Sequence, residues 1–436
     1  MNTLTDSPHP QDGQGGLRRN RPFLTLMAAQ LVSNVGEWLY VLALLAMVGM
    51  KWQATPWEIT VMSLCMAVPS LLGGPIAGVL ADRMNRKRLM IGSDLVRAGL
   101  VALFLFAGTL WQVYALLIAK GLMDVLFSPA KSGKLKELVP SGQMEQAVSV
   151  SASIEQITKI AGPALGGVLV GMFGISVCYG IDAAAFLMSA LLLLRLPAEF
   201  RRSREAAGAQ GLASFRKDLS AGIAFISGMP MLMGGLLLLV SALLVLQVAD
   251  SQAVTLLRTI PDMNEGVLGW CIGASGLGTL LYVLAAGKLG AGRPLLLMSA
   301  GAVTMGAVFA AAGVITGSGL NGYGLYAVLF SAFLVAGAGA GMIFIPFQTL
   351  LQQRTPETYS GRVFGTVGSL TSAAVILGPV AGGALVTAAG PLSAYLLSGS
   401  LLVLLGCGML LLRTAIERRD IRSSEAAAAL PETAVL

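Results

Sequence analysis

Twelve long, mainly apolar stretches, separated by short polar connections, restrict what this chain can fold into more than any other feature. A helix needs about 20 mostly apolar residues to cross a bilayer. Lipid offers no partners for backbone polar groups, so only helices and closed barrels can span it. The sequence therefore predicts an all-α membrane protein with twelve transmembrane helices. We expect spans at roughly 22–50, 56–81, 89–108, 112–135, 144–172, 174–195, 230–257, 265–287, 294–315, 322–352, 360–387 and 391–413.

The composition supports the same conclusion. Hydrophobic residues make up 55% of the chain, charged residues only 12%, and the mean hydropathy is +0.77. A soluble domain carries about 25% charged residues. Most of the surface must therefore face lipid, which predicts a multi-pass protein of the cell membrane.

The distribution of basic residues predicts the orientation. With these spans, 24 of the 29 Lys and Arg fall on one set of alternating loops and tails. Only Lys51 and Arg258 fall on the other side. Loops rich in Lys and Arg stay in the cytoplasm, so we expect both termini there. The net charge of +7 is then explained by topology, and no nucleic-acid partner is expected.

The chain divides into two halves joined by a basic linker. We expect a cytoplasmic tail at 1–21, a six-helix half at 22–195, a linker at 196–229, a second six-helix half at 230–413 and a cytoplasmic tail at 414–436. Within the linker, Ser214–Gly228 has apolar residues at helical spacing beside charged ones. This pattern is typical of an amphipathic helix lying on the inner membrane surface.

The two halves repeat one another. A GPxxGG motif in the fifth span recurs 216 residues later in the eleventh, and Pro140 recurs as Pro356 at the same offset. Parallel six-helix repeats are a known transporter architecture, with substrate bound between the halves. The motif residues act either in close helix packing or as hinges: Gly162, Pro163, Gly166 and Gly167 in the first copy, and Gly378, Pro379, Gly382 and Gly383 in the second.

Several ionisable residues lie inside the expected spans, where they are costly and usually functional. Glu37 shares one helical face with Gln30 and Asn34, has no obvious partner nearby, and should face a water-filled cavity. Burial favours its protonated form, so Glu37 is our first candidate for proton coupling. Asp124 is the second candidate, although a structural pair with Lys120 one turn away is equally compatible with the sequence.

Two further pairs at helical spacing are Asp94 with Arg97 and Glu155 with Lys159; we expect the former to support the basic loop structurally. Asp182 enters the sixth span, and Asp250 lies in the outer part of the seventh. The second half is otherwise apolar within its spans, which suits an amphipathic or cationic lipophile. Candidate cavity residues are Gln30, Asn34, Ser128, Gln156, Phe344, Phe347 and Gln348.

Other chemistries have little support. The four cysteines are dispersed, the one histidine is His9 in the polar N-terminal tail, and there is no P-loop. We therefore expect no enzyme activity, no metal site and no cofactor, with the proton-motive force as the source of energy.

The connector between the second and third spans carries Gly78, Asp82, Arg83, Arg86 and Lys87. This pattern resembles the corresponding loop of major facilitator superfamily transporters, and it implies that fold. Asn85 stands where the family usually has a second glycine, and we expect it to adopt a left-handed turn. The resemblance also implies that Asp82 contacts the start of the eleventh helix, around Ser360–Val363, as a cytoplasmic gate that Arg86 reinforces.

Four stretches resemble the macrolide-efflux branch of drug:proton antiporters. They are Gln30–Trp38, Gly78–Gly92 with Asp94 and Arg97, Gly162–Gly167, and Gly361–Phe364. The resemblance implies a bacterial exporter of hydrophobic or amphipathic molecules that works by alternating access. Its partners would be the lipid bilayer, the substrate and protons, and we expect a monomer.

Two alternatives stay open. Ser128–Lys131, Glu137–Pro140 and Ile345–Gln352 are similar to lysophospholipid transporters. In that reading Lys131 binds a phosphate headgroup, whereas we prefer to place it as a basic loop residue. A membrane sensor that keeps the fold without transport is the other alternative, and the intact gate motif argues against it.

Overall fold

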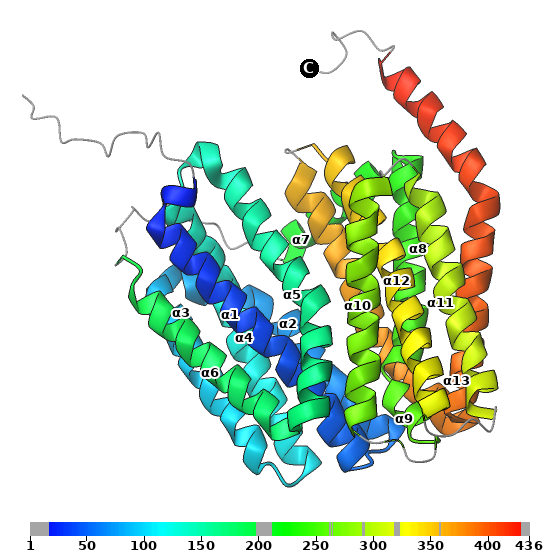
Figure 1. Cartoon of the computed structure of the whole chain (residues 1–436). Helices are drawn as coiled ribbons and strands as arrows, with labels where there is room; N and C mark the ends of the chain where they lie inside the picture. Colours follow the sequence, from blue (N-terminus) through cyan, green and yellow to red (C-terminus); the bar gives the residue numbers. More distant parts are fainter. Residues whose placement is uncertain are drawn as a thin grey trace, which may run out of the picture.

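The computed structural model describes residues 17–197, 212–260, 263, 265–289, 293–317, 323–356 and 359–428, and these are almost entirely helical (Figure 1). The first half contains α1 (Arg21–Leu45), continued by the π-helix η2 (Ala46–Lys51), α2 (Pro56–Arg83), α3 (Arg86–Leu103), α4 (Leu110–Leu138), α5 (Met144–Phe173) and α6 (Ile175–Leu194). After the linker helix α7 (Leu212–Ser227) come α8 (Pro230–Asp250), the short α9 (Ala253–Leu257), α10 (Glu265–Leu289), α11 (Pro294–Gly317), α12 (Tyr323–Arg354) and α13 (Ser360–Ala428).

The helices coincide with the expected spans to within a few residues at most ends. In the described part of the chain, nine helical stretches are long and apolar enough to cross a membrane. One of them, Arg362–Arg422, covers nearly all of the eleventh and the twelfth expected spans, because α13 runs continuously through both and only bends at Gly390. The expected count of twelve spans stays a prediction.

The repeat is visible in the backbone. Gly174 separates α5 from α6 with φ 81°, and Gly390 divides α13 with φ 82°. The two positions are 216 residues apart, the offset of the GPxxGG motifs. Residues with a side chain rarely adopt this left-handed region, so glycine is required at both bends. Pro129 and Pro346 also lie inside equivalent helices, α4 and α12.

Each half packs as its own helical bundle. In the first, α1 packs on α5 and α6, α2 on α4, and α3 on α4 and α6. In the second, α8 and α11 pack on α13, and α12 packs on α10 and α11. The halves meet where α5 contacts α10 and where α13 contacts α2, two interfaces that correspond by the repeat.

Local sequence signals set several helix ends. Thr55 and Glu58 form a capping box at the start of α2, with Pro56 as its first residue. Asn85 directly precedes α3, and its side-chain oxygen accepts a hydrogen bond of 2.9 Å from the Arg88 amide. Its φ is −66°, so the expectation of a left-handed turn was wrong. Asn85 acts as a helix N-cap, a position that favours asparagine.

The linker and the C-terminus are helical where they are described. Helix α7 overlaps the predicted amphipathic segment; near its end Phe225 stacks on Tyr359, with ring centroids 4.8 Å apart, and Ile226 is buried. This end of α7 therefore packs against protein. Helix α13 continues past residue 413, and Asp420 forms an ion pair of 3.1 Å with Arg354.

Candidate functional site

A cluster of charged side chains lies inside the first bundle, centred on Lys120 of α4. The Lys120 side chain is only 4% exposed. Its Nζ atom lies 3.1 Å from Glu37 Oε1 on α1 and 3.0 Å from Asp124 Oδ2 on α4. One buried cation thus joins two carboxylates on two helices.

Arg97 of α3 extends the cluster. Its guanidinium donates to Asp124 Oδ1 at 3.0 Å and also to Asp94 on its own helix. The other Asp94 oxygen accepts a hydrogen bond of 2.7 Å from Ser189 on α6. Asp124 is therefore shared between Lys120 and Arg97, and the network connects α1, α3, α4 and α6.

Aromatic rings surround both cations. The Arg97 guanidinium lies 4.4 Å from the centroid of the Phe127 ring and 4.5 Å from that of Phe186. Lys120 Nζ lies 5.0 Å from the Tyr40 ring and 5.6 Å from the Phe186 ring. Cation–π contacts are strongest when the cation is desolvated. Arg97 and Lys120 are both buried, so these rings help to stabilise their charges.

Asp182 of α6 is a fourth carboxyl group near these cations. It is fully buried, and neither of its side-chain oxygens has a hydrogen-bond partner among the described residues. It lies within electrostatic range of Lys120, Glu37 and Arg97. A methyl group on Gly36 would lie 2.5 Å from Asp182 Oδ1, so the glycine lets α1 approach this carboxyl group.

The cluster confirms some of the predicted pairs and corrects one expectation. Asp94 pairs with Arg97, and Lys120 pairs with Asp124, as the spacing indicated. Glu37, expected to lack a partner, instead pairs with Lys120 from a distant part of the chain. The Glu37 side chain is still 40% exposed.

The expected pair between Glu155 and Lys159 was wrong. Glu155 pairs with Lys131 at 2.9 Å. The preferred placement of Lys131 in a loop was also wrong, because it lies inside α4 beyond Pro129. Lys159 instead reaches across to the second half, where its Nζ atom lies 5.9 Å from the Phe344 ring of α12.

The predicted cavity residues do not form one lining. Gln30 is buried and exchanges two hydrogen bonds with Ser151 of α5, at 3.0 and 2.8 Å, so it joins two helices and does not face water. Phe347 is fully buried in the core of the second bundle. Ser128 is exposed, and the remaining described candidates are partly buried: Asn34, Phe344 and Gln348. The side chain of Gln156 lies outside the described part.

The basic connector contacts two neighbouring helices. Arg86 donates to Glu137 at 2.8 Å and to the Gly133 carbonyl at 3.3 Å, both on α4. Lys87 donates to the carbonyls of Leu194 and Leu196 at the end of α6. The side chains of Asp82 and Arg83, and the surroundings of Gly78, lie outside the described part. The gate contact of Asp82 therefore stays a prediction.

The two GPxxGG motifs lie at equivalent contacts between the halves. A methyl group on Gly167 would lie 1.9 Å from the Gly269 carbonyl of α10, and one on Gly383 would lie 2.2 Å from Thr60 Oγ1 of α2. The first two glycines of each motif face their own bundle. In the first copy Gly162 and Gly166 face α1, and in the second copy Gly378 and Gly382 face α8. Pro379 accepts a hydrogen bond of 3.1 Å from Thr60 through its carbonyl. The side chain of Pro163 lies outside the described part.

Further contacts between the halves lie near the same end of the molecule, where α2 begins and α8 ends. We call it the distal end, because the start of α1 and the end of α13 are at the other end (Figure 1). Gln252 donates to the Pro56 carbonyl at 3.1 Å, and Arg258 donates to the Ala54 carbonyl at 2.7 Å. The halves are therefore tied together at the distal end.

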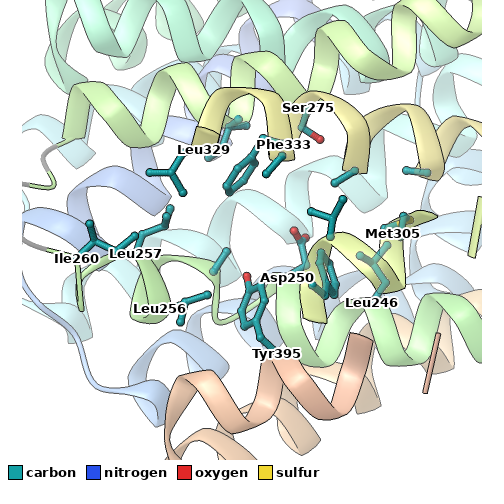
Figure 2. Close-up of a pocket in the computed structure, with 17 residues that line it drawn as sticks. Leu246, Asp250, Leu256, Leu257, Ile260, Ser275, Met305, Leu329, Phe333 and Tyr395 are labelled. Atoms are coloured by element: carbon teal, nitrogen blue, oxygen red, sulfur yellow. The ribbon is translucent and has the colours of Figure 1, made fainter. Parts of the chain in front are cut away.

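A cavity in the second bundle was not predicted from the sequence. It has a volume of about 270 Å³ and is lined by residues of α8 to α13, including Asp250 and Tyr395 (Figure 2). None of the predicted cavity residues whose side chains are described lines it. The one sequence signal was Asp250 near the end of an otherwise apolar span.

The comparisons with known proteins agree with this architecture. The family model of the Major Facilitator Superfamily matches residues 26–365 and 253–434. The uncharacterized MFS-type transporter YfiS of Bacillus subtilis (strain 168) is 38% identical over 92% of this chain and 95% of its own length.

Two relatives with named substrates are more distant. The enterobactin exporter EntS of Citrobacter koseri is 30% identical over 92% of this chain and 94% of its own. Macrolide efflux protein A of Streptococcus pyogenes is 26% identical over 87% of this chain and 93% of its own. The crystal structure of the nucleoside transporter NupG aligns with a TM-score of 0.64 at 14% identity, covering 89% of this chain and 98% of that one.

Proposed function

Because this chain belongs to the Major Facilitator Superfamily, whose members are membrane transporters and not enzymes, we propose that it is a proton-coupled secondary active exporter. The substrates are hydrophobic or amphipathic small molecules, and transport proceeds by alternating access. The protein lies in the cell membrane of a bacterium with both termini in the cytoplasm, and it acts as a monomer.

One observation carries the proposal of proton coupling. The described cluster contains four carboxyl groups, Glu37, Asp94, Asp124 and Asp182, but only two cations, Arg97 and Lys120. Uncompensated charge within a membrane is costly. The cluster approaches neutrality only when it binds protons, so it is a store of exchangeable protons inside the bilayer.

Glu37 is the member best placed to exchange its proton. Its side chain is the most accessible of the paired carboxylates, and its partner Lys120 has Asp124 as a second counter-ion. Protonation of Glu37 thus leaves Lys120 with a partner. Protonation shifts the balance between two conformations when it favours one of them, and α1 is one of the helices that would move.

Outward transport is supported by the relatives, and alternating access by the contacts at the distal end. Two relatives are named as an exporter and an efflux protein. At the distal end, Gly167 packs closely on the backbone of Gly269 and Gly383 packs closely on the side chain of Thr60, and these contacts hold the halves together in one state. Alternating access requires these contacts to separate in the other state.

The lysophospholipid alternative loses its main support. Lys131, the residue that would bind a phosphate headgroup, already pairs with Glu155 at 2.9 Å. A phosphate would have to displace this carboxylate. We therefore favour a substrate without a phosphate group.

Proteoliposomes with an imposed pH gradient test the proposal. Substrate uptake is followed for macrolides, lipophilic cations and lysophospholipids, with a trapped pH-sensitive dye to record proton movement. Gradient-dependent transport with counter-movement of protons is expected for one of the first two classes. Transport that proceeds equally without a gradient and moves no protons would contradict the coupling.

A further inference from the structure

The cavity of the second bundle combines an apolar lining with a single charged group. Seventeen residues line it, and besides Asp250 the only polar side chains among them are Ser275 and Tyr395. The apolar lining comes from five helices and includes Leu246, Leu256, Met305, Leu329 and Phe333 (Figure 2). Ligand sites are usually of this kind, mostly apolar with a few placed polar groups.

Asp250 has no counter-ion in the part of the chain that the structure describes. It makes no hydrogen bond and no ion pair with any part of the chain that the structure describes. Figure 2 shows its carboxylate within the ring of lining side chains, near Tyr395. The basic residue closest along the chain, Arg258, is turned toward the first half and donates to the Ala54 carbonyl at 2.7 Å.

The position of Asp250 on its helix makes this lack of a partner more significant. Asp250 is the last residue of α8, and the C-terminus of a helix carries partial negative charge that disfavours an anion. Asp250 is exposed to the cavity, so water can hydrate its carboxylate when the cavity is empty. An apolar ligand that displaces this water leaves the carboxylate uncompensated unless the ligand carries a positive charge. Both effects favour a positive charge beside Asp250, and the described lining supplies none.

Aromatic rings form part of the wall near Asp250. The Phe309 and Tyr395 rings pack with centroids 5.2 Å apart at an interplanar angle of 54°, and Phe333 lies on the wall formed by α12. Aromatic faces attract organic cations. Because the lining offers few hydrogen-bond acceptors, it suits a cation whose charge is shielded by hydrocarbon groups, such as a quaternary ammonium or a phosphonium.

We propose that this cavity is a binding site for a lipophilic organic monocation, with Asp250 as its counter-ion. The inference rests on the proposed function in naming a class of exported substrate. Binding itself requires no proton gradient and does not involve the charge cluster of the first bundle.

Equilibrium binding to the purified full-length protein in detergent tests the site. Tetraphenylphosphonium is the probe, and tetraphenylborate, which has almost the same shape and the opposite charge, is the matched control. Asp250→Asn keeps the size of the side chain but removes its charge, and should weaken tetraphenylphosphonium binding about ten- to hundredfold. Asp250→Glu should retain binding. Ala336→Phe, which fills the cavity from α12, should abolish it.

One control variant separates this site from other parts of the molecule. Glu58→Gln makes the same kind of change at a partly exposed carboxylate of the first half, and it should bind the probe as the parent protein does. Equal binding of tetraphenylborate would overturn the proposal. So would unchanged affinity in a folded Asp250→Asn protein. Gradient-driven transport, measured on the same preparation, tests the proposed function separately, because either measurement can fail while the other succeeds.

Discussion

Lys120 Nζ lies 3.1 Å from Glu37 Oε1, and this ion pair joins α4 to α1 in the interior of the first bundle. Lys120 is buried, whereas Glu37 is 40% exposed. The carboxylate is therefore the member of the pair that water and protons can reach. The first two predictions concern this pair.

Glu37→Gln should fold normally and lose gradient-driven export. Glutamine retains the size of the side chain and a hydrogen-bond acceptor for Lys120, but it cannot release a proton. Substrate binding and passive exchange should persist, because neither needs a proton cycle. The measurement is transport in proteoliposomes with and without a pH gradient. Glu58→Gln, at the exposed start of α2, is the matched control. Full gradient-driven export by Glu37→Gln would move the coupling role to Asp124 or Asp182.

Lys120→Met should destabilise the protein. It leaves Glu37 and Asp124 without their shared cation, although Asp124 keeps Arg97. Loss of one partner of a buried pair costs about 3–5 kcal/mol. We expect less here, because Glu37 and Asp124 are partly exposed and can be hydrated. Thermal unfolding in detergent measures the effect. Adding Glu37→Gln to Lys120→Met should recover part of the loss, whereas additive losses would show that the two residues are not coupled.

Gly36→Ala should separate α1 from α6. The added methyl group would lie 2.5 Å from Asp182 Oδ1 and 2.8 Å from Ala185 Cβ. Overpacking of this kind costs about 1–3 kcal/mol. Gly99→Ala on α3 is the control, since no atom lies within 4 Å of its added methyl group, and alanine should slightly favour that helix. Equal melting temperatures for the two variants would contradict the close approach at Asp182.

Gly167→Ala and Gly383→Ala should weaken the contact between the halves at the distal end. Their methyl groups would lie 1.9 Å and 2.2 Å from Gly269 and Thr60, so the helices must move apart. Hydrogen exchange should then become faster at the starts of α2 and α10. Gly365→Ala, with open space around it, should change nothing. If exchange at these helix starts is unaffected in both motif variants, the motifs do not hold the two halves together.

The orientation can be tested by cysteine labelling in a background without the four native cysteines. Arg88 is exposed at the start of α3, and Gln53 lies beside the distal end. Arg88→Cys should react with a membrane-impermeant maleimide only from the cytoplasmic side, and Gln53→Cys only from outside. The reverse pattern would invert the topology and the proposed direction of transport.

Local sequence determined much of this architecture. Long apolar stretches and flanking caps predicted the helices, since the cost of unpaired backbone groups in lipid leaves few other options. Pairs one helical turn apart, such as Asp94 with Arg97 and Lys120 with Asp124, were also predictable, because helix geometry places such residues together. The 216-residue repeat indicated two equivalent halves, and the matching bends at Gly174 and Gly390 agree with it.

Only the tertiary structure decided which distant charges meet. Glu37 and Lys120 are 83 residues apart in the sequence. Lys131 of α4 pairs with Glu155 of α5, a residue on another helix. These partners depend on the rotation and depth of each helix in its bundle, which apolar packing fixes and which a nearly uniform apolar sequence does not encode locally. For the same reason the cavity around Asp250 could not be predicted: its lining residues become neighbours only when six helices pack around the space that their side chains leave unfilled.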